Sequence, residues 1–202
     1  MNNIYVRQLF EPHEAQRILE DVASEEYGQF KRSRLYDASS GKMHFKVIED
    51  QRRSWEQVFH SHSRFAWIKS RVTGHVRNAL SEFGLEIDNL SYPQGLRFIR
   101  YNSDELGFQD WHTDRSKDNR ILTCVVQLTD PAQYKGARLE FQSPVLSQMV
   151  PVEQGSLIIF PSDQSHRVSE CTQGTRYSLI IWAEEHGMEL PEGFVEDDIN
   201  AN

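Results

Sequence analysis

Apolar residues recur every three or four positions in two stretches of the first half of the chain, which predicts two amphipathic helices. The first covers residues 11–24, where Pro12 suits the first turn. The second covers residues 64–83, and Gly84 is a natural stop at its end. Because its apolar positions form one stripe, we expect the second helix to pack on the outside of a sheet. The positions in question are Ala15, Ile18, Leu19 and Val22 in the first stretch and Phe65, Ile68, Val72, Val76, Leu80 and Phe83 in the second.

From Leu96 onward the pattern changes to that of strands. The chain there consists of short runs rich in Ile, Val and aromatic residues, and turn residues separate them. Many short strands without intervening helices predict an antiparallel β-sandwich. Residues 25–60 follow neither pattern clearly. The predicted strands are Leu96–Tyr101, Ile121–Thr129, Arg138–Phe141, Ser156–Phe160, Arg167–Ser169 and Arg176–Ala183.

The length of 202 residues fits a single domain with a substantial core. No apolar run approaches the roughly 20 residues that span a bilayer, and the first residues lack the apolar segment of a secretory signal. We therefore expect a cytoplasmic protein without a membrane partner. Two cysteines, Cys124 and Cys171, do not indicate a disulfide framework. The expected organisation is one domain over 1–202, with helical N-terminal support over about 1–91, a core over about 92–185 and an acidic tail over about 187–202.

The candidate chemistry lies at His112-Thr113-Asp114, followed far downstream by His166. If the triplet is extended, the side chains of His112 and Asp114 leave the same face, because side chains alternate along a strand. Two imidazoles and one carboxylate form the facial triad that holds non-haem Fe(II) with open positions. Arg176 follows His166 by ten residues, and its guanidinium could clamp a second carboxylate. An isolated His-x-Asp is also common by chance, usually as a surface pair or a capping arrangement.

The segments around the triplet make the iron interpretation more specific. In order they are Arg100-Tyr101-Asn102, Gly107 to Trp111, Gly136 to Phe141, Gly155 to Ser162, His166-Arg167-Val168, Gly174 to Leu179, and Trp182. This ordered series resembles the prolyl 4-hydroxylase-like branch of the Fe(II)/2-oxoglutarate dioxygenases, and in particular the bacterial hydroxylases with a compact prolyl-hydroxylase-type domain. The resemblance covers about residues 92–185. It implies a double-stranded β-helix, or jelly roll, in a mostly β protein with flanking N-terminal helices.

The resemblance also assigns roles to residues. It implies that His112, Asp114 and His166 are the catalytic residues that bind Fe(II), and that Arg176 binds the distal carboxylate of 2-oxoglutarate, the co-substrate. O2 is the second co-substrate, and ascorbate would serve as a reductant. The related halogenases replace the aspartate with a small residue, so the intact Asp114 favours hydroxylation.

Four further residues are expected near the co-substrate, each with a purely structural alternative. Ser178 and Trp182 share a strand face with Arg176 by alternation, and Trp182 would otherwise fill the core. Tyr101 matches a family tyrosine, although tyrosines in strands usually pack. Gln127 stands where some relatives place a tyrosine toward the co-substrate, which leaves its second polar partner open. A milder departure is Ala137, where relatives often carry a second glycine.

We expect hydroxylation of a C–H bond with release of succinate and CO2, with a prolyl residue of a peptide or protein as substrate. Residues 30–55 and the loop 102–110 would form part of the groove. The alternatives are a free amino acid or small metabolite, and a non-catalytic jelly-roll binding module. The basic residues between Lys31 and Arg53 would form either a solvated face or a wall toward the substrate. The net charge of −8 argues against a nucleic-acid partner. The oligomeric state is left open.

Overall fold

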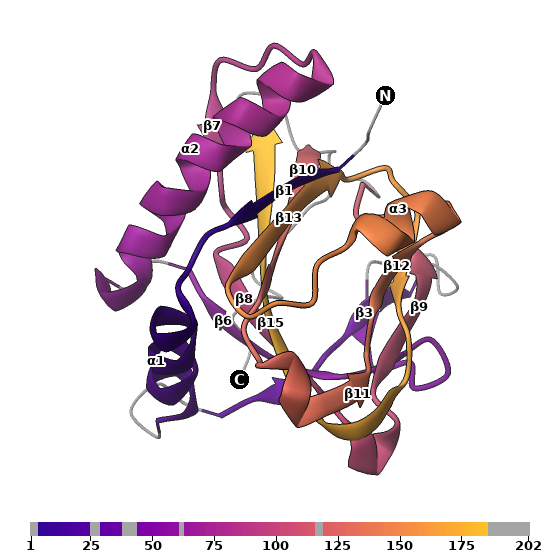
Figure 1. Cartoon of the computed structure of the whole chain (residues 1–202). Coiled ribbons are helices and arrows are strands. Elements are labelled where there is room, and N and C mark those ends of the chain that lie inside the picture. Colours follow the sequence, from indigo (N-terminus) through magenta and orange to yellow (C-terminus); the bar gives the residue numbers. More distant parts are fainter. Residues whose placement is uncertain (1–3, 25–28, 38–43, 61–62, 116–118, 186–202) are drawn as a thin grey trace.

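Two antiparallel β-sheets form most of the molecule, and two helices lie on the outside of the larger sheet (Figure 1). The computed structural model describes residues 4–24, 29–37, 44–60, 63–115 and 119–185. Most regular structure in these ranges is strand, so the predicted class, mostly β with flanking N-terminal helices, is confirmed. No helix in the described ranges is long and apolar enough to cross a membrane. The expected acidic tail, 187–202, lies outside these ranges.

The larger sheet contains nine strands within the described residues. Seven of them follow one another in the order β1 (Tyr5–Gln8), β13 (Ser156–Pro161), β10 (Arg120–Gln127), β15 (Cys171–Glu185), β8 (Leu96–Asn102), β6 (Trp55–Phe59) and β2 (Lys31–Arg32). The remaining two, β7 (Leu90–Ser91) and β11 (Tyr134–Gly136), also pair with the long strand β15. Strand β15 therefore pairs with four other strands of this sheet, namely β10, β8, β7 and β11.

The smaller sheet faces the larger one and contains four strands within the described part of the chain. Their order is β12 (Leu139–Phe141), β14 (His166–Val168), β9 (Phe108–His112) and β5 (Arg52–Arg53). A separate pair consists of β3 (Leu35–Asp37) and β4 (His44–Lys46). The short helices are α3 (Pro144–Met149) and the 3-10 turns Ser63–Phe65, Ser103–Glu105 and Pro131–Gln133.

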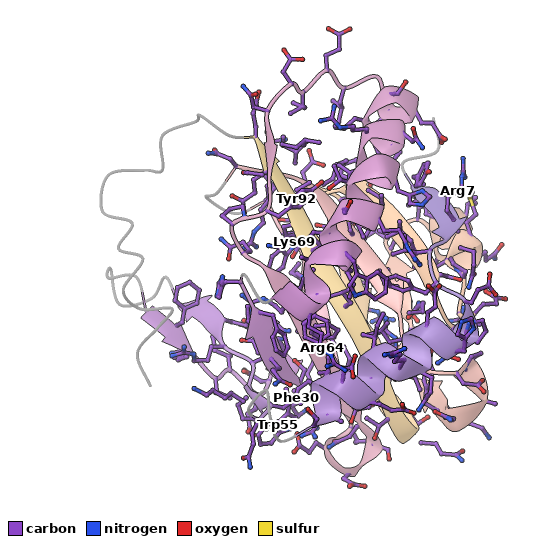
Figure 2. All side chains as sticks on the ribbon, turned by 90° about the vertical axis from the view of Figure 1, so that its left-hand side faces the viewer. Arg7, Phe30, Trp55, Arg64, Lys69 and Tyr92 are labelled. Atoms are coloured by element: carbon purple, nitrogen blue, oxygen red, sulfur yellow. The ribbon has the colours of Figure 1, made fainter. Side chains whose placement is uncertain are left out.

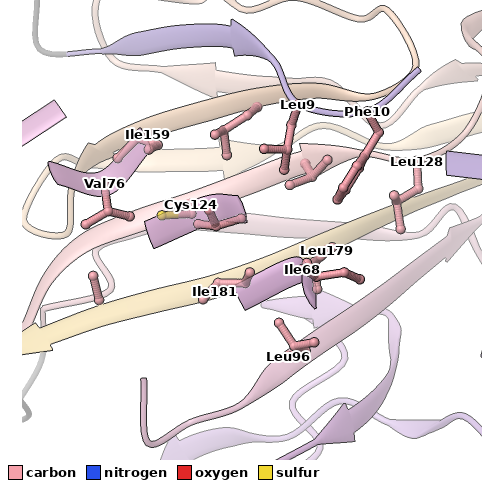
Figure 3. Close-up of a cluster of buried hydrophobic side chains, with 14 of the residues drawn as sticks. Leu9, Phe10, Ile68, Val76, Leu96, Cys124, Leu128, Ile159, Leu179 and Ile181 are labelled. Atoms are coloured by element: carbon pink, nitrogen blue, oxygen red, sulfur yellow. The ribbon is translucent and has the colours of Figure 1, made fainter. Parts of the chain in front are cut away.

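Helices α1 (Pro12–Ala23) and α2 (Ala66–Phe83) cover the outer face of the larger sheet (Figure 2). The apolar stripe of α2 is buried against alternate residues of β10 and β15, and the cluster between them includes Ile68, Val76, Cys124, Leu179 and Ile181 (Figure 3). Burial of each such side chain contributes about 1.5–3 kcal/mol. Because the odd-numbered residues of β15 from Leu179 to Ala183 face the helices, the even-numbered ones face the space between the two sheets. This alternation directs Arg176, Ser178 and Trp182 inward.

The first ninety residues were expected to be mainly helical, but they also contain several strands. Strands β1, β2 and β6 extend the larger sheet at both edges, and β5 extends the smaller one. These strands are short, and β1 pairs with β13 about 150 residues away, since Tyr5 lies opposite Ile159. The expected boundary at residue 92 therefore cuts through both sheets rather than separating a helical support from a core.

Ala137, which stands where relatives often carry a second glycine, strains the turn before β12. Ala137 has a φ of +45°, in the left-handed region, and its side chain is completely buried. Gly136 before it has a φ of +75°, and a Cβ on it would lie 1.9 Å from the carbonyl oxygen of Glu170. A left-handed backbone costs a residue with a Cβ roughly 1–2 kcal/mol, so alanine is tolerated here at the expense of local strain.

Candidate active site

The two histidines of the predicted triad lie opposite each other on neighbouring strands of the smaller sheet. His112 is the last residue of β9, His166 is the first residue of β14, and the two are partners in the strand register. Their ring centroids are 4.2 Å apart. The ring of Phe160 packs edge-on against His166, with 4.8 Å between the centroids. Residues 54 positions apart are thus brought together by strand pairing, which does not depend on any contact with an ion.

Both imidazoles are oriented by backbone carbonyl groups. Nδ1 of His112 lies 2.7 Å from the carbonyl oxygen of Asp110, and Nδ1 of His166 lies 2.9 Å from that of Gln164. A carbonyl oxygen only accepts, so each Nδ1–H donates and each Nε2 is left with its lone pair. Metal-binding histidines are held in the same way. The amide nitrogen of Gln109 lies 2.8 Å from Nε2 of His112 and would have to turn away when that atom binds a metal.

Asp114 is positioned by a loop and not by a strand. The condition under which His112 and Asp114 would leave one strand face, an extended triplet, is not met, because β9 ends at His112. The backbone N–H groups of Asp114 and Arg115 both donate to the carbonyl oxygen of Ser162, at 2.8 and 2.9 Å. The carboxylate accepts a hydrogen bond of 2.7 Å from Oγ1 of Thr123, which also lies 3.1 Å from Oγ of Ser162.

The three side chains nevertheless converge. Nε2 of His112 lies 3.7 Å from Oδ1 of Asp114, and Nε2 of His166 lies 3.6 Å from Oδ2. One ligand atom from each residue falls within 4.8 Å of the others, which suits a single metal ion. Two imidazole nitrogens and one carboxylate are the donor set of non-haem Fe(II) sites.

The electrostatics of the cluster suit a cation. Burial, assisted by the neighbouring His166, lowers the pKa of His112 to about 4. Burial alone would raise the pKa of Asp114, but the two imidazoles and Arg120 outweigh it and lower that pKa to about 2. At neutral pH His112 is therefore neutral and Asp114 ionised. These are the protonation states that metal ligands require.

Arg176 lies on the facing strand β15 and is almost completely buried, at 1% exposure. Its Nε and Nη2 donate to the side-chain oxygen of Gln127 at 3.1 and 2.8 Å, and the amide nitrogen of Gln127 donates to the carbonyl oxygen of Pro151 at 3.0 Å. Nη1 has no hydrogen-bond partner among the described residues. A buried guanidinium held by a neutral amide, with one donor left over, fits the carboxylate of a bound anion.

Tyr101 connects the arginine with the histidines. It is the register partner of Arg176 on β8, and the Arg176 guanidinium carbon lies 5.7 Å from its ring centre. Its hydroxyl donates to the side-chain oxygen of Gln109 at 3.4 Å, and Gln109 in turn contacts His112. Burial raises the pKa of Tyr101, so the phenol stays protonated and can donate. An elongated diacid lying between Arg176 and the histidines would pass this hydroxyl.

The other predicted residues are also on the inner face. Ser178 is buried two residues after Arg176. Trp182 lies between the guanidinium groups of Arg97 and Arg120, whose central carbons are 5.3 and 3.8 Å from its ring. Its interaction with Asp114 helps to lower the pKa of that carboxyl, although the buried indole nitrogen has no hydrogen bond of full geometry among the described residues. Trp182 therefore belongs to the surroundings of Asp114.

Several residues that support the site were missed at the sequence level. Thr123 and Ser162 hold the Asp114 segment, and Gln109 lies between Tyr101 and His112. The sequence could have indicated a role for Thr123, because it is the only hydroxyl-bearing residue in the apolar run Ile121–Val126 and shares the inner strand face with Gln127. Ser162 and Gln109 carried none, because their contacts join segments that are distant in the sequence.

Comparison with known proteins places residues 96–184 within the family model described as 2OG-Fe(II) oxygenase superfamily. The chain is 32% identical over 93 residues to a PKHD-type hydroxylase from Synechococcus sp. strain CC9311, and 28% identical over 102 residues to one from Acinetobacter baylyi. These matches cover 45% and 50% of this chain. They span only 42% and 37% of the relatives' own lengths, so the whole-protein activity of those relatives is not transferred by the match alone.

Solved structures extend the likeness to nearly the whole fold. A prolyl-4-hydroxylase from Pseudomonas putida superposes with a TM-score of 0.65 over 93% of this chain and 95% of its own, at 16% identity. A prolyl hydroxylase from Trichoplax adhaerens, solved in complex with a peptide fragment of hypoxia inducible factor, has the same TM-score over 92% of this chain and 84% of its own, at 14% identity. These structures confirm the predicted jelly roll, and the family model and the PKHD-type relatives confirm the resemblance to the Fe(II)/2-oxoglutarate dioxygenases.

Proposed function

Because residues 96–184 of this chain belong to the 2OG-Fe(II) oxygenase superfamily, we propose that the protein is a 2-oxoglutarate-dependent hydroxylase that acts on a prolyl residue of a peptide or protein. One observation carries the proposal. The cluster of His112, Asp114 and His166 and the buried, incompletely bonded Arg176 lie in the same interior, connected by Tyr101.

Different residues would bind the metal and the co-substrate. His112, Asp114 and His166 would hold Fe(II), which together with 2-oxoglutarate and O2 supplies the oxidising power for C–H hydroxylation. Arg176 would bind the distal carboxylate through its unpaired Nη1, with its other two donors kept in place by Gln127. Tyr101 and Ser178 would donate further hydrogen bonds from the same face.

The interior also keeps water away from the reacting centre. Asp114 and His166 are 8% and 5% exposed, and Phe160 covers the ring of His166. Strand β9 leaves His112 less buried than either, so this ring lies on the side from which a substrate can approach. Exclusion of water on one side and access on the other suits an enzyme that hydroxylates an incoming C–H group.

A peptide substrate is supported by exposed apolar side chains on strand β9 and in the turn before it. Trp111, the preceding residue, is 39% exposed, and Leu106 in the turn before β9 is 42% exposed. The Trp111 ring stacks on Arg167 on the face of the smaller sheet opposite His112, so these side chains lie outside the iron pocket. They would contact only a substrate that extends beyond the hydroxylated residue, which suits a chain longer than a single amino acid. Residues 108–110, expected in the loop 102–110 of the substrate groove, are part of strand β9, which pairs with β14 on one side and β5 on the other. That part of the groove wall would therefore be a paired strand and not a loop.

The proposal is tested by mass spectrometry of a proline-peptide library and a set of free amino acids after incubation with Fe(II), ascorbate and 2-oxoglutarate. Proline-containing peptides should gain one oxygen atom and free L-proline should be a poor substrate. The His166→Ala variant is the control for products of free iron. Efficient hydroxylation of free L-proline or another amino acid, with no turnover across the peptide library, would instead establish the small-molecule alternative.

A further inference from the structure

Arg52, a cation near the active site, has no anionic partner among the residues that the structure describes. Arg52 lies on strand β5 opposite Gln109 of β9, the residue that contacts both Tyr101 and His112. Its positive charge is close enough to lower the pKa of both Tyr101 and His112. Arg52 is therefore beside the iron site, on the smaller sheet, whereas Arg176 lies on the larger sheet that faces it.

The Arg52 side chain is held in place at its base and open at its tip. Nε donates to Oγ of Ser54 at 2.7 Å, and the Ser54 hydroxyl donates to Oγ of Ser33 at 2.9 Å. Both serines are 2% exposed, so this support is buried. The terminal nitrogens Nη1 and Nη2 have no hydrogen bond or ion pair with any described residue, and the side chain is only half-buried. The two donors of the fork remain available.

Neighbouring arginines of the same basic stretch are neutralised. Arg32 forms ion pairs with Glu49 and Glu105. Arg53 donates to the carbonyl oxygen of Glu105 at 2.8 Å and lies 3.5 Å from the carboxylate of Glu170. These two arginines serve the structure of the protein itself. Arg52 lies among them with two free Nη donors and no carboxylate partner in the described part of the chain. A fixed guanidinium fork of this kind suits an external carboxylate.

We propose that Arg52 binds a carboxylate of the substrate, so that the substrate is acidic at or next to the hydroxylated residue. The inference rests on the proposed function and narrows its substrate class. The co-substrate has its own cation in the almost fully buried Arg176. Arg52 is only half-buried and lies near His112, the least buried of the three proposed metal ligands, so an incoming substrate can reach it. The carboxylate belongs either to an Asp or Glu side chain beside a prolyl residue or to the α-carboxylate of a free amino acid.

Binding can be measured without turnover on protein loaded with Mn(II) and an unreactive 2-oxoglutarate analogue, from the metal-dependent NMR relaxation of two pairs of probes. The first pair is acetyl-Pro-Glu amide and acetyl-Pro-Gln amide, and the second is L-proline and L-prolinamide. We expect the acid of one pair to bind about tenfold or more tightly than its amide, the factor typical of a charge-assisted hydrogen bond. The pair that shows the preference identifies the source of the carboxylate.

Variants then assign the preference to Arg52. Arg52→Gln should bind acid and amide equally, and Arg52→Lys, which keeps the charge but loses the fork, should retain part of the preference. Arg53→Gln on the same strand is the matched control and should retain all of it. Equal binding of acid and amide by the wild type in both pairs, including no binding of any probe, would overturn the inference. So would an unchanged preference in Arg52→Gln, or a loss of 2-oxoglutarate affinity in that variant as large as in Arg176→Gln.

The two proposals can fail separately. If the substrate is not a peptide, the second pair still shows the acid preference, and only the proposed function falls. If peptides gain oxygen regardless of a neighbouring acidic residue, the proposed function stands and the role of Arg52 falls.

Discussion

Removing the Thr123 hydroxyl should weaken Fe(II) binding while leaving the fold intact. Thr123→Val replaces a hydroxyl by a methyl group of similar size in a residue that is 1% exposed. The change removes the hydrogen bond of 2.7 Å to Oδ2 of Asp114 and the contact of 3.1 Å with Oγ of Ser162. The carboxylate keeps its attachment through the backbone but loses the side-chain donor that orients it.

The size of the effect follows from the kind of bond that is lost. A hydrogen bond to an ionised group is worth about 1.5–3 kcal/mol, and about 1.4 kcal/mol corresponds to tenfold in affinity. Thr123→Val should therefore weaken Fe(II) binding by roughly ten- to hundred-fold, the range known for residues that support metal ligands. Anaerobic calorimetric titration with Fe(II) measures this directly.

Thr129→Val is the matched control. Thr129 is also buried, but its hydroxyl oxygen accepts from the backbone N–H of Tyr177 at 2.7 Å and does not touch the metal cluster. Urea unfolding without metal should show a loss of about 1–3 kcal/mol in the control variant, whereas its Fe(II) affinity should stay at the wild-type value. Wild-type Fe(II) affinity in Thr123→Val, or an equal loss of affinity in Thr129→Val, would refute the assignment of Thr123 as a support of the metal site.

Three further predictions concern the co-substrate and the pH dependence of stability. Arg176→Gln should weaken 2-oxoglutarate binding by roughly ten- to hundred-fold and leave Fe(II) binding nearly unchanged in the same titrations. An unaffected 2-oxoglutarate affinity would show that another residue binds its distal carboxylate. Gln127→Glu places a carboxylate against Arg176 that competes with the co-substrate, so it should lower 2-oxoglutarate affinity at least tenfold. An unchanged affinity would show that the contact between residue 127 and Arg176 does not affect co-substrate binding. The pKa of His75 is lowered from 6.5 by burial and by Arg7, so its contribution to stability is present above about pH 6.5 and is lost as the pH falls below that value; His75→Gln should flatten the unfolding free energy in that range, and a profile identical to the wild type would contradict the shift.

The elements that could be predicted from sequence are those whose pattern repeats over many residues. The two helices and the strands β8, β10, β12, β13, β14 and β15 were predicted from their periodicity, whereas β9 and β11 were not. Helix α2 ends before Gly84 as expected, and that glycine has a left-handed φ of +69°. Strands β1, β2 and β5 have four, two and two residues and were missed. Their definition comes from partners in distant parts of the chain, which local pattern does not record.

The candidate site divides in the same way. The identity of the predicted ligands came from the short motif and its flanking segments, but their positions depend on pairing between segments that are far apart. The contact between Asp114 and Ser162 replaces the expected strand geometry. Gln127 stands where some relatives place a tyrosine, and its side-chain oxygen accepts a hydrogen bond from Arg176. It therefore helps to hold the guanidinium that would bind the co-substrate. Neither contact leaves a trace in local hydrophobic periodicity.

The central claim, that this chain is a 2-oxoglutarate-dependent oxygenase, is tested most directly with isotopically labelled oxygen. The wild-type protein is incubated with Fe(II), 2-oxoglutarate and ¹⁸O₂, and the succinate produced is examined by mass spectrometry, with and without the proline-peptide library. We predict succinate that carries one ¹⁸O atom, formed faster with the library, and none above background in Asp114→Ala or without Fe(II). No labelled succinate from the wild type, or equal production by Asp114→Ala, would contradict the account.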